Sequence, residues 1–122
     1  STLFPYTTLF RSLSCSSNQL TSLDVSNNTA LTFLNCEQNL LTSLNVSANT
    51  ALIELDLESN QLTSLDVSNN TALTSLAITN QQLTSLDLSN NTALTFFDCN
   101  SSNLNLNLKK YPIKWIYFRI LG

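Results

Sequence analysis

The sequence predicts a mainly β solenoid, in which short parallel strands stack from coil to coil with little or no helix. Three observations lead to this fold class. The chain repeats every 21 residues from 13 to about 105, the same columns of the repeat are aliphatic in every copy, and asparagine recurs at two of its corners. A unit of this length can cover its apolar face only with a neighbouring copy, so the copies must fold together. We expect a coil of about 4.5 turns.

Each repeat contains two halves with the same apolar spacing. The first-half columns are Leu13, Leu34, Leu55, Leu76 and Phe97, then Cys15, Cys36, Leu57, Ile78 and Cys99, and then Leu20, Leu41, Leu62, Leu83 and Leu104. The second-half columns are Leu23, Leu44, Leu65 and Leu86, then Val25, Val46, Val67 and Leu88, and then Leu31, Leu52, Leu73 and Leu94. The alternation at the start of each half is typical of a strand with every second side chain inward. We therefore expect strands on one or both sides of the coil.

Asparagine is expected to shape the corners. One column is Asn28, Asn49, Asn70 and Asn91, and a second is Asn18, Asn39 and Asn60, followed by Gln81 and Ser102. Glycine occurs only at position 122, so another residue must supply the turns. Asparagine can adopt the left-handed conformation, and its amide can satisfy backbone groups that a turn leaves unpaired.

The run from Leu31 to Leu41, with the pattern L-x-x-L-x-C-x-x-N-x-L, resembles the leucine-rich repeat consensus. The half-turn LTSLDVSNNT resembles that of the short 21-residue bacterial subclass, similar to repeats of secreted or surface proteins of Bacteroidetes. The resemblance covers residues 13 to about 105 and implies a right-handed coil whose strand face binds proteins or other macromolecules. It also implies an extracellular or cell-surface location, and a parent chain with further repeats.

The two ends depart from the period. Residues 1–12 resemble the in-frame translation of a short-read sequencing adapter, so we expect a non-native segment there and the solenoid over 13–105. Residues 106–122 are expected to form an irregular tail. The tail is either a cap that lays Trp115, Ile116, Phe118 and Ile120 over the last coil, or a segment whose reading frame was lost. Its apolar run is too short to span a membrane.

The charge is unevenly distributed. The net charge is −3, but all eight acids lie between residues 24 and 98, whereas the five basic residues lie at positions 11, 109, 110, 114 and 119. The repeats therefore carry 0 − 8 = −8, which would repel nucleic-acid phosphates. The chain has no histidine, phosphate-binding glycine loop or nucleophile placed beside a base. We expect no enzymatic activity and no cofactor.

Cys15, Cys36 and Cys99 share one inward column with Leu57 and Ile78. We expect buried thiols that act as small hydrophobic residues. Their spacings of 21 and 63 residues disfavour a metal site. Cys15 and Cys36 could be neighbours, but side chains that point the same way are poorly placed for a disulfide.

Variation between repeats indicates a binding face. The second half hardly changes, whereas the outward positions of the first half differ from coil to coil. We predict that this face binds a protein, with a basic partner favoured, or another surface macromolecule. The predicted contact residues are Phe33, Asn35, Glu37, Glu54, Asp56, Glu58, Phe96 and Asp98. The alternative is repeat duplication followed by neutral drift, which would leave a solvated acidic face.

Three other functions are weaker interpretations. Glu54, Asp56 and Glu58 could bind calcium, but they lack the loop pattern of dedicated calcium sites, and a solvated stripe is favoured. The column of Thr21, Thr42, Thr63 and Thr84 beside a serine column is similar to the arrays of ice-binding solenoids, although an adjoining Asp column interrupts it. The repeats could also be a passive spacer within a larger surface protein.

Overall fold

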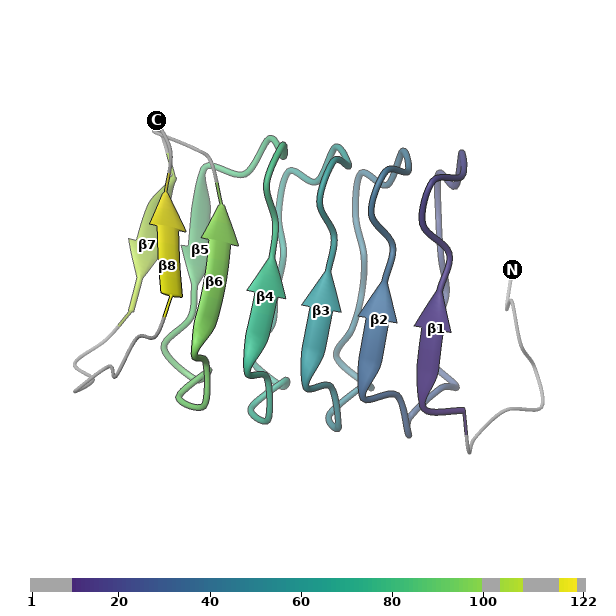
Figure 1. The fold of residues 1–122 in the computed structure, drawn as a ribbon, viewed down its shortest axis with the longest axis horizontal. Coiled ribbons are helices and arrows are strands. Elements are labelled where there is room, and N and C mark those ends of the chain that lie inside the picture. The colour runs from purple at the N-terminus through teal and green to yellow at the C-terminus, as the bar shows by residue number, and fades with distance from the viewer. Residues whose placement is uncertain (1–9, 100–103, 109–116, 121–122) are drawn as a thin grey trace.

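The computed structural model describes residues 10–99, 104–108 and 117–120. Over these residues the chain is a β-solenoid of about four turns with parallel strands and no helix. In Figure 1 the strands stand side by side along the long axis, and the rest of each coil runs behind them. Each 21-residue repeat therefore corresponds to one coil, as the periodicity predicts. No helix in the described part of the chain is long and apolar enough to cross a membrane.

Six strands form one parallel sheet in the order β1-β2-β3-β4-β6-β8. They are β1 (Ser12–Ser14), β2 (Phe33–Asn35), β3 (Glu54–Asp56), β4 (Ser75–Ala77), β6 (Phe96–Cys99) and β8 (Tyr117–Ile120). Neighbouring strands are in register at the repeat length, since Leu34 pairs with both Leu13 and Leu55. Most strands have three residues, an inward leucine with an outward residue on either side. They therefore end just before the second apolar column of Cys15, Cys36, Leu57 and Ile78.

Among the described residues, the second halves form a two-stranded sheet at one end of the solenoid. There β5 (Ser85–Asp87) pairs with β7 (Asn105–Asn107). Leu86 pairs with Leu106, an offset of 106 − 86 = 20 residues, which reflects the one-residue slip in the sequence after Leu104. In coils two and three the second halves run past each other without forming strands, and Thr63 N donates to Thr42 O at 3.4 Å. The sequence left open whether strands lie on one side of the coil or on both. The main six-stranded sheet lies on one side, and β5 and β7 lie on the other.

The backbone of β8 returns to the 21-residue offset. Phe118 pairs with Phe97 and Ile120 with Cys99, so the columns of the first half continue into this strand. Of the residues expected in a cap, Trp115 and Ile116 lie outside the described residues, as do residues 1–9 of the predicted non-native segment.

The core is a single apolar column inside the coils. Leu31, Leu34, Leu52, Leu55 and Leu76 are among its fully buried side chains, and Phe97 is the largest. Leu20, Leu23, Leu65 and Leu104 are only half-buried, although the periodicity places them inside. Cys36 and Cys99 are buried and Cys15 is half-buried, and all three are free thiols. The prediction of thiols acting as small core residues is confirmed for Cys36 and Cys99.

The two asparagine columns hold successive coils together. Asn39 Nδ2 donates to the carbonyls of Cys15 and Cys36 at 3.0 Å each, and its Oδ1 accepts from Leu20 N at 3.0 Å. In the other column, Asn70 Nδ2 donates to Val46 O at 3.0 Å and to Asn49 O at 2.8 Å. The predicted role of asparagine in satisfying backbone groups is therefore confirmed.

The left-handed corner residues are not the column asparagines. Positive φ angles occur at Ser17 (58°), Gln38 (56°), Ser59 (56°) and Asn80 (57°), each one residue before the Asn18/Asn39/Asn60 column. The expectation that asparagines of the columns adopt this conformation is wrong. The amide must face inward to reach two carbonyls, so the preceding residue makes the turn.

Candidate functional site

The outward side chains of the first halves form three rows across the main sheet, which we call the sheet face. Pairing of the strands places Ser12, Phe33, Glu54, Ser75 and Phe96 in the first row, and Ser14, Asn35, Asp56, Ala77 and Asp98 in the second. By the same period, the third row holds Ser16, Glu37, Glu58 and Thr79 just after the strands. The structure therefore brings all eight predicted contact residues onto one side of the molecule.

The two phenylalanines lie in the same row at some distance from each other. Phe33 is on β2 and Phe96 on β6, and both are half-buried rather than fully exposed. Three strand-to-strand steps separate them, which corresponds to about 14 Å. Glu54 and Ser75 stand between them in the row. The aromatic rings are therefore two separate apolar areas with an exposed carboxylate between them.

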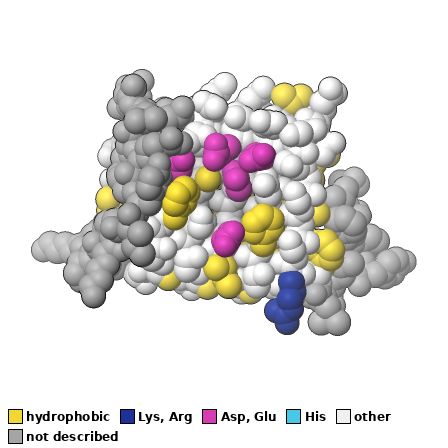
Figure 2. Space-filling model, in the orientation of Figure 1, with side chains coloured by type: hydrophobic (Ala, Val, Ile, Leu, Met, Phe, Trp, Pro, Cys, Tyr) yellow, Lys and Arg dark blue, Asp and Glu magenta, His cyan; other side chains and the backbone are white. Residues whose placement is uncertain are grey.

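Three carboxylates gather in the middle of the sheet face. Partial burial raises the pKa of Asp56 above its ordinary 3.8, and the charges of nearby Glu58 and Glu37 raise it further. Glu58 accepts a hydrogen bond of 2.6 Å from Thr79 Oγ1 on the next coil. Figure 2 shows the acidic side chains of this face grouped together, with hydrophobic surface beside them. This part of the face has a concentrated negative charge.

Asp98 differs from the sequence-based expectation. We expected an outward carboxylate open to solvent, but Asp98 is only 5% exposed. Asp98 lies on β6, an interior strand of the sheet that has β4 on one side and β8 on the other. Asp98 is therefore not part of the open acidic surface.

Some predicted contact residues also have a structural role. Asn35 Oδ1 accepts from Glu37 N at 2.9 Å, and Asp56 Oδ1 accepts from Glu58 N at 3.1 Å, so both side chains stabilise the turn after their strand. Thr79 was not among the predicted contact residues, although it is buried beside Glu58. The repeat period could have predicted this contact, because Thr79 lies one repeat of 21 residues after Glu58.

The described residues contain no group of three or more His, Cys, Asp or Glu side chains arranged to hold a metal ion. Glu54 lies in the first row, Asp56 in the second and Glu58 in the third. The oxygens of Asp56 and Glu58 are also used within the protein, by Glu58 N and by Thr79. Two of the three acids therefore have hydrogen-bond partners within the protein.

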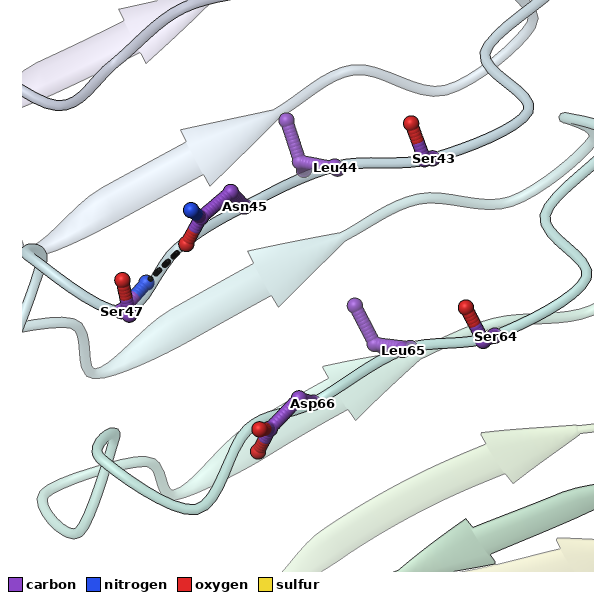
Figure 3. A pocket seen from close by; sticks show the side chains of 7 residues that line it. All are labelled: Ser43, Leu44, Asn45, Ser47, Ser64, Leu65 and Asp66. Atoms are coloured by element: carbon purple, nitrogen blue, oxygen red, sulfur yellow. Dashed lines mark hydrogen bonds between the residues drawn. The ribbon is translucent and has the colours of Figure 1, made fainter.

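The opposite side of the solenoid carries two shallow hollows between coils. Figure 3 shows one of about 380 Å³, lined by Ser43, Leu44, Asn45, Ser47, Ser64, Leu65 and Asp66. The next, of about 370 Å³, is lined by Ser64, Leu65, Asp66, Ser68, Ser85, Leu86 and Asp87. Each opens between two second halves.

Comparison with known proteins identifies the architecture. The sequence matches no protein-family model and none of the curated proteins. Among solved structures, the functional domain of InlJ from Listeria monocytogenes, described as including a cysteine ladder, is similar with a TM-score of 0.80 and 30% identity. That match covers 94% of this chain and 30% of the solved InlJ chain. The internalin InlF from Listeria monocytogenes is similar with a TM-score of 0.70 and 27% identity, over 84% of this chain and 32% of that one.

This chain thus spans about a third of the length of the two Listeria structures. Both of these neighbours are leucine-rich repeat proteins, and their coils superpose on most of the present chain. The repeat period, the parallel sheet and the two structural neighbours together identify this chain as a leucine-rich repeat solenoid.

Proposed function

We propose that this chain is a non-catalytic protein-binding or adhesion module that recognises its partner through the sheet face. The observation that carries the proposal is the difference between the two sides of the solenoid. The rows of the sheet face change from coil to coil, whereas the second halves repeat LTSLDVS almost unchanged. A surface that only needs to be soluble can stay repetitive, but a surface that recognises one partner needs different side chains at different places.

The side chains on this face suit a partner with basic and apolar groups. Phe33 and Phe96 offer apolar contact, and aromatic residues commonly contribute much of the binding energy in protein interfaces. Glu37, Glu54 and Glu58 surround them with negative charge, which favours a partner with Lys or Arg at the interface and speeds its association. A basic protein is therefore the partner class that we favour.

The similarity to internalins supports the same function and an extracellular or cell-surface location. Since the chain spans about a third of each neighbour, we propose that it is one part of a longer repeat protein. The parent would then present a longer sheet face, of which the described coils form one section.

Substitution of the two aromatic residues tests the proposal. A peptide library displayed on phage and selected against the immobilised chain would supply the binding partners. We expect the double variant Phe33→Ser, Phe96→Ser to lose about 30- to 1,000-fold in affinity for the selected partners, since each truncation of an interface aromatic residue costs on the order of 1–2 kcal/mol and the two distant sites add. Biolayer interferometry would measure the change.

Leu40→Ser is the matched control, because Leu40 is an apolar side chain of 42% exposure that lies off the sheet face. We expect this variant to bind as the parent does, and circular dichroism would verify that both variants keep the fold. Partners that bind the double variant and the parent equally well, or that lose affinity only with Leu40→Ser, would contradict the assignment of the sheet face.

A further inference from the structure

One column of the repeat loses its usual residue beside the first row of the sheet face. This column lies directly before the first row and holds Thr32, Ile53, Thr74 and Thr95. Each of the threonine hydroxyls donates to the carbonyl of the residue 21 positions earlier, as Thr74 Oγ1 does to Ile53 O at 3.3 Å. Ile53 cannot make this bond, and its side chain is 42% exposed. At this position an apolar surface therefore replaces a repeated contact between coils.

The exposed isoleucine lies near Phe33 and Glu54. Ile53 N donates to Thr32 O at 2.8 Å, and Glu54, the next residue, pairs with Phe33. The Glu54 carboxylate is exposed, and no Lys or Arg occurs between residues 12 and 108, so the repeats themselves hold no cation that could neutralise it. Figure 2 shows acidic and hydrophobic side chains next to each other on this face. This end of the first row therefore offers apolar contact together with negative charge.

The second aromatic residue of the row sets a length for whatever binds there. Phe33 and Phe96 are three strand-to-strand steps apart, or about 14 Å. An extended chain advances about 3.4 Å per residue, so its side chains at positions i and i+4 leave the same face about 14 Å apart. In an α-helix, side chains of one face are about 10.5 Å apart at i and i+7, and about 16.5 Å apart at i and i+11. An extended segment therefore matches the row, whereas a helix does not.

The charge falls between the two apolar points. In an extended segment with apolar residues at i and i+4, the residue at i+2 also faces the row, about 7 Å from the first apolar residue. Glu54 lies one strand step, or about 5 Å, from Phe33 along the same row. The long side chain of Lys or Arg covers the remaining difference of about 2 Å. The row thus matches the pattern apolar–x–basic–x–apolar.

We propose that the first row of the sheet face binds an extended segment of a partner protein with this pattern. Phe33 and Ile53 receive one apolar side chain, Phe96 receives the other, and Glu54 pairs with the basic residue between them. This rests on the proposed function, which makes the sheet face the binding surface. It adds the conformation of the bound segment, its residue pattern, and a contact residue, Ile53, that is not among the eight predicted from the sequence.

Two phage-displayed libraries of linear peptides of equal length test the spacing against the immobilised full chain. In the first library, Leu-x-Lys-x-Leu fixes two apolar residues four positions apart. In the second, Leu-x-x-Lys-x-x-x-Leu fixes them seven positions apart, which is a helical spacing. We expect selection to enrich the first library at least about 10-fold over the second, because only its members place both leucines on the row in an extended conformation. Equal enrichment, or enrichment of neither library, overturns the proposal.

Charge reversal at Glu54 tests the polar contact. The probe is a fluorescein-labelled synthetic peptide with the most enriched sequence, and fluorescence polarisation measures its affinity. Glu54→Lys should weaken binding about 30-fold, and a peptide with Glu in place of its central Lys should bind this variant within about 3-fold of the original pair. The matched control is the double variant Ser64→Lys, Ser85→Lys, which makes the same change of two charges on the opposite side, where both serines are exposed. This control should bind the probe within about 2-fold of the parent.

Ile53→Thr separates recognition from folding, because threonine is the residue of this column at positions 32, 74 and 95. We expect the affinity for the probe to fall about 3- to 10-fold with the loss of an apolar contact. The thermal midpoint should stay the same or rise, because the new hydroxyl can donate to Thr32 O as the other threonines of the column donate to their neighbours. Circular dichroism would measure the midpoint.

Two further results would overturn the proposal. One is a Glu54→Lys variant that loses no more affinity than the control, or that the peptide of reversed charge does not restore. The other is an Ile53→Thr variant that binds the probe as tightly as the parent. If the double variant Phe33→Ser, Phe96→Ser still loses affinity in these cases, the proposed function stands without the extended basic segment. If that variant also binds like the parent, both fail.

Discussion

At the scale of single residues, the repeats provide natural comparisons, because different side chains occupy the same column in nearly the same backbone. Asn35 and Asp56 both accept a hydrogen bond from the residue two positions later. Asn45 and Asp66 do the same in the second halves. A substitution from one coil to another therefore keeps the turn and changes only the charge or shape of the side chain.

The left-handed corner gives the first prediction at this scale. Gln38 has a φ of 56°, a conformation that costs a residue with a Cβ atom roughly 1–2 kcal/mol. Gln38→Gly should therefore raise the free energy of unfolding by about 0.5–1 kcal/mol, after the greater flexibility of glycine in the unfolded chain is subtracted. Urea denaturation followed by circular dichroism would measure it.

Gln61→Gly is the control for this prediction. Gln61 is also exposed, but its φ is not positive, so glycine should destabilise the protein there by about 0.5–1 kcal/mol. If both glycine substitutions lower stability equally, the corner is not strained.

Asp56 gives a prediction about pH. Its pKa is raised in the folded protein, so the folded state binds the proton more tightly than the unfolded state does. As the pH rises above 3.8 and this proton is lost, the free energy of unfolding therefore falls. Asp56→Asn should keep the hydrogen bond from Glu58 N, because Asn35 accepts the equivalent bond from Glu37 N. It should also remove the repulsion between Asp56 and the carboxylates of Glu37 and Glu58. We expect a gain of about 0.5 kcal/mol at pH 7, the size of a cross-strand charge interaction. The gain should vanish below about pH 3.8, where the carboxyl is protonated in both states.

Asp66 should behave in the opposite way. Hydrogen bonds from the side chain and backbone of Ser68 hold the pKa of Asp66 below 3.8, so its contribution is present at neutral pH and is lost as the pH falls through the folded-state pKa. Asp66→Asn should therefore give no gain at pH 7. Urea midpoints of the two variants, measured between pH 3 and 7, would make the comparison. Equal changes in midpoint for Asp56→Asn and Asp66→Asn would show that the charge around Asp56 does not cause the gain in stability.

At the scale of elements, the strands are short and the polar columns supply much of the connection between coils. Each strand of the main sheet has three or four residues. The two asparagine columns are not equivalent. Asn39 and Asn60 use both ends of the amide, whereas the buried Oδ1 atoms of Asn49, Asn70 and Asn91 accept no hydrogen bond from the described residues. The column beside the sheet is therefore the more completely bonded of the two.

Asn60 tests the contribution of this column. Its Nδ2 donates to Cys36 O at 2.9 Å and Leu57 O at 3.0 Å, and its Oδ1 accepts from Leu41 N at 3.0 Å. Asn60→Ala leaves these buried backbone groups without partners and should lower the free energy of unfolding by about 2–4 kcal/mol. Thermal and urea denaturation would measure the loss.

Asn60→Gln is the conservative counterpart. Gln81 stands in the same column one coil later, where it accepts from Leu62 N at 3.0 Å and donates to Leu57 O. We therefore expect Asn60→Gln to cost less than about 1 kcal/mol. A loss as large as that of Asn60→Ala would mean that the shape of the side chain, and not its amide, supports the corner.

At the scale of the whole molecule, the solenoid separates the repeated core from the face that varies between coils. The apolar columns and the corner amides repeat in every coil and hold the stack together, whereas the sheet face carries the differences between coils. Because each coil contacts mainly its two neighbours, a change on the face of one coil need not disturb the others. This arrangement lets the rows around Phe33, Glu54 and Phe96 vary without loss of the fold.

The sequence by itself determined the solenoid, the coil length, the inward columns and the face that varies. It could do so because the pattern repeats within one chain, and a fixed period forces equivalent residues into equivalent places along the stack. The order of the main sheet and its register at Leu13, Leu34 and Leu55 follow directly from this period. The slip after Leu104 is also visible in the sequence and appears as the 20-residue register of β5 and β7.

Only the tertiary structure decided which side of the coil forms the main sheet, which corner residues are left-handed, and which predicted contact residues are open. Asp98 is buried on β6, which is an interior strand because β8 pairs with it, and no repeat pattern could place β8 across an aperiodic segment of sequence. The contact between the sulfurs of Cys15 and Cys36 likewise depends on side-chain direction in two adjacent coils. A period specifies which residues become neighbours, whereas exposure and contact depend on how those neighbours pack in three dimensions.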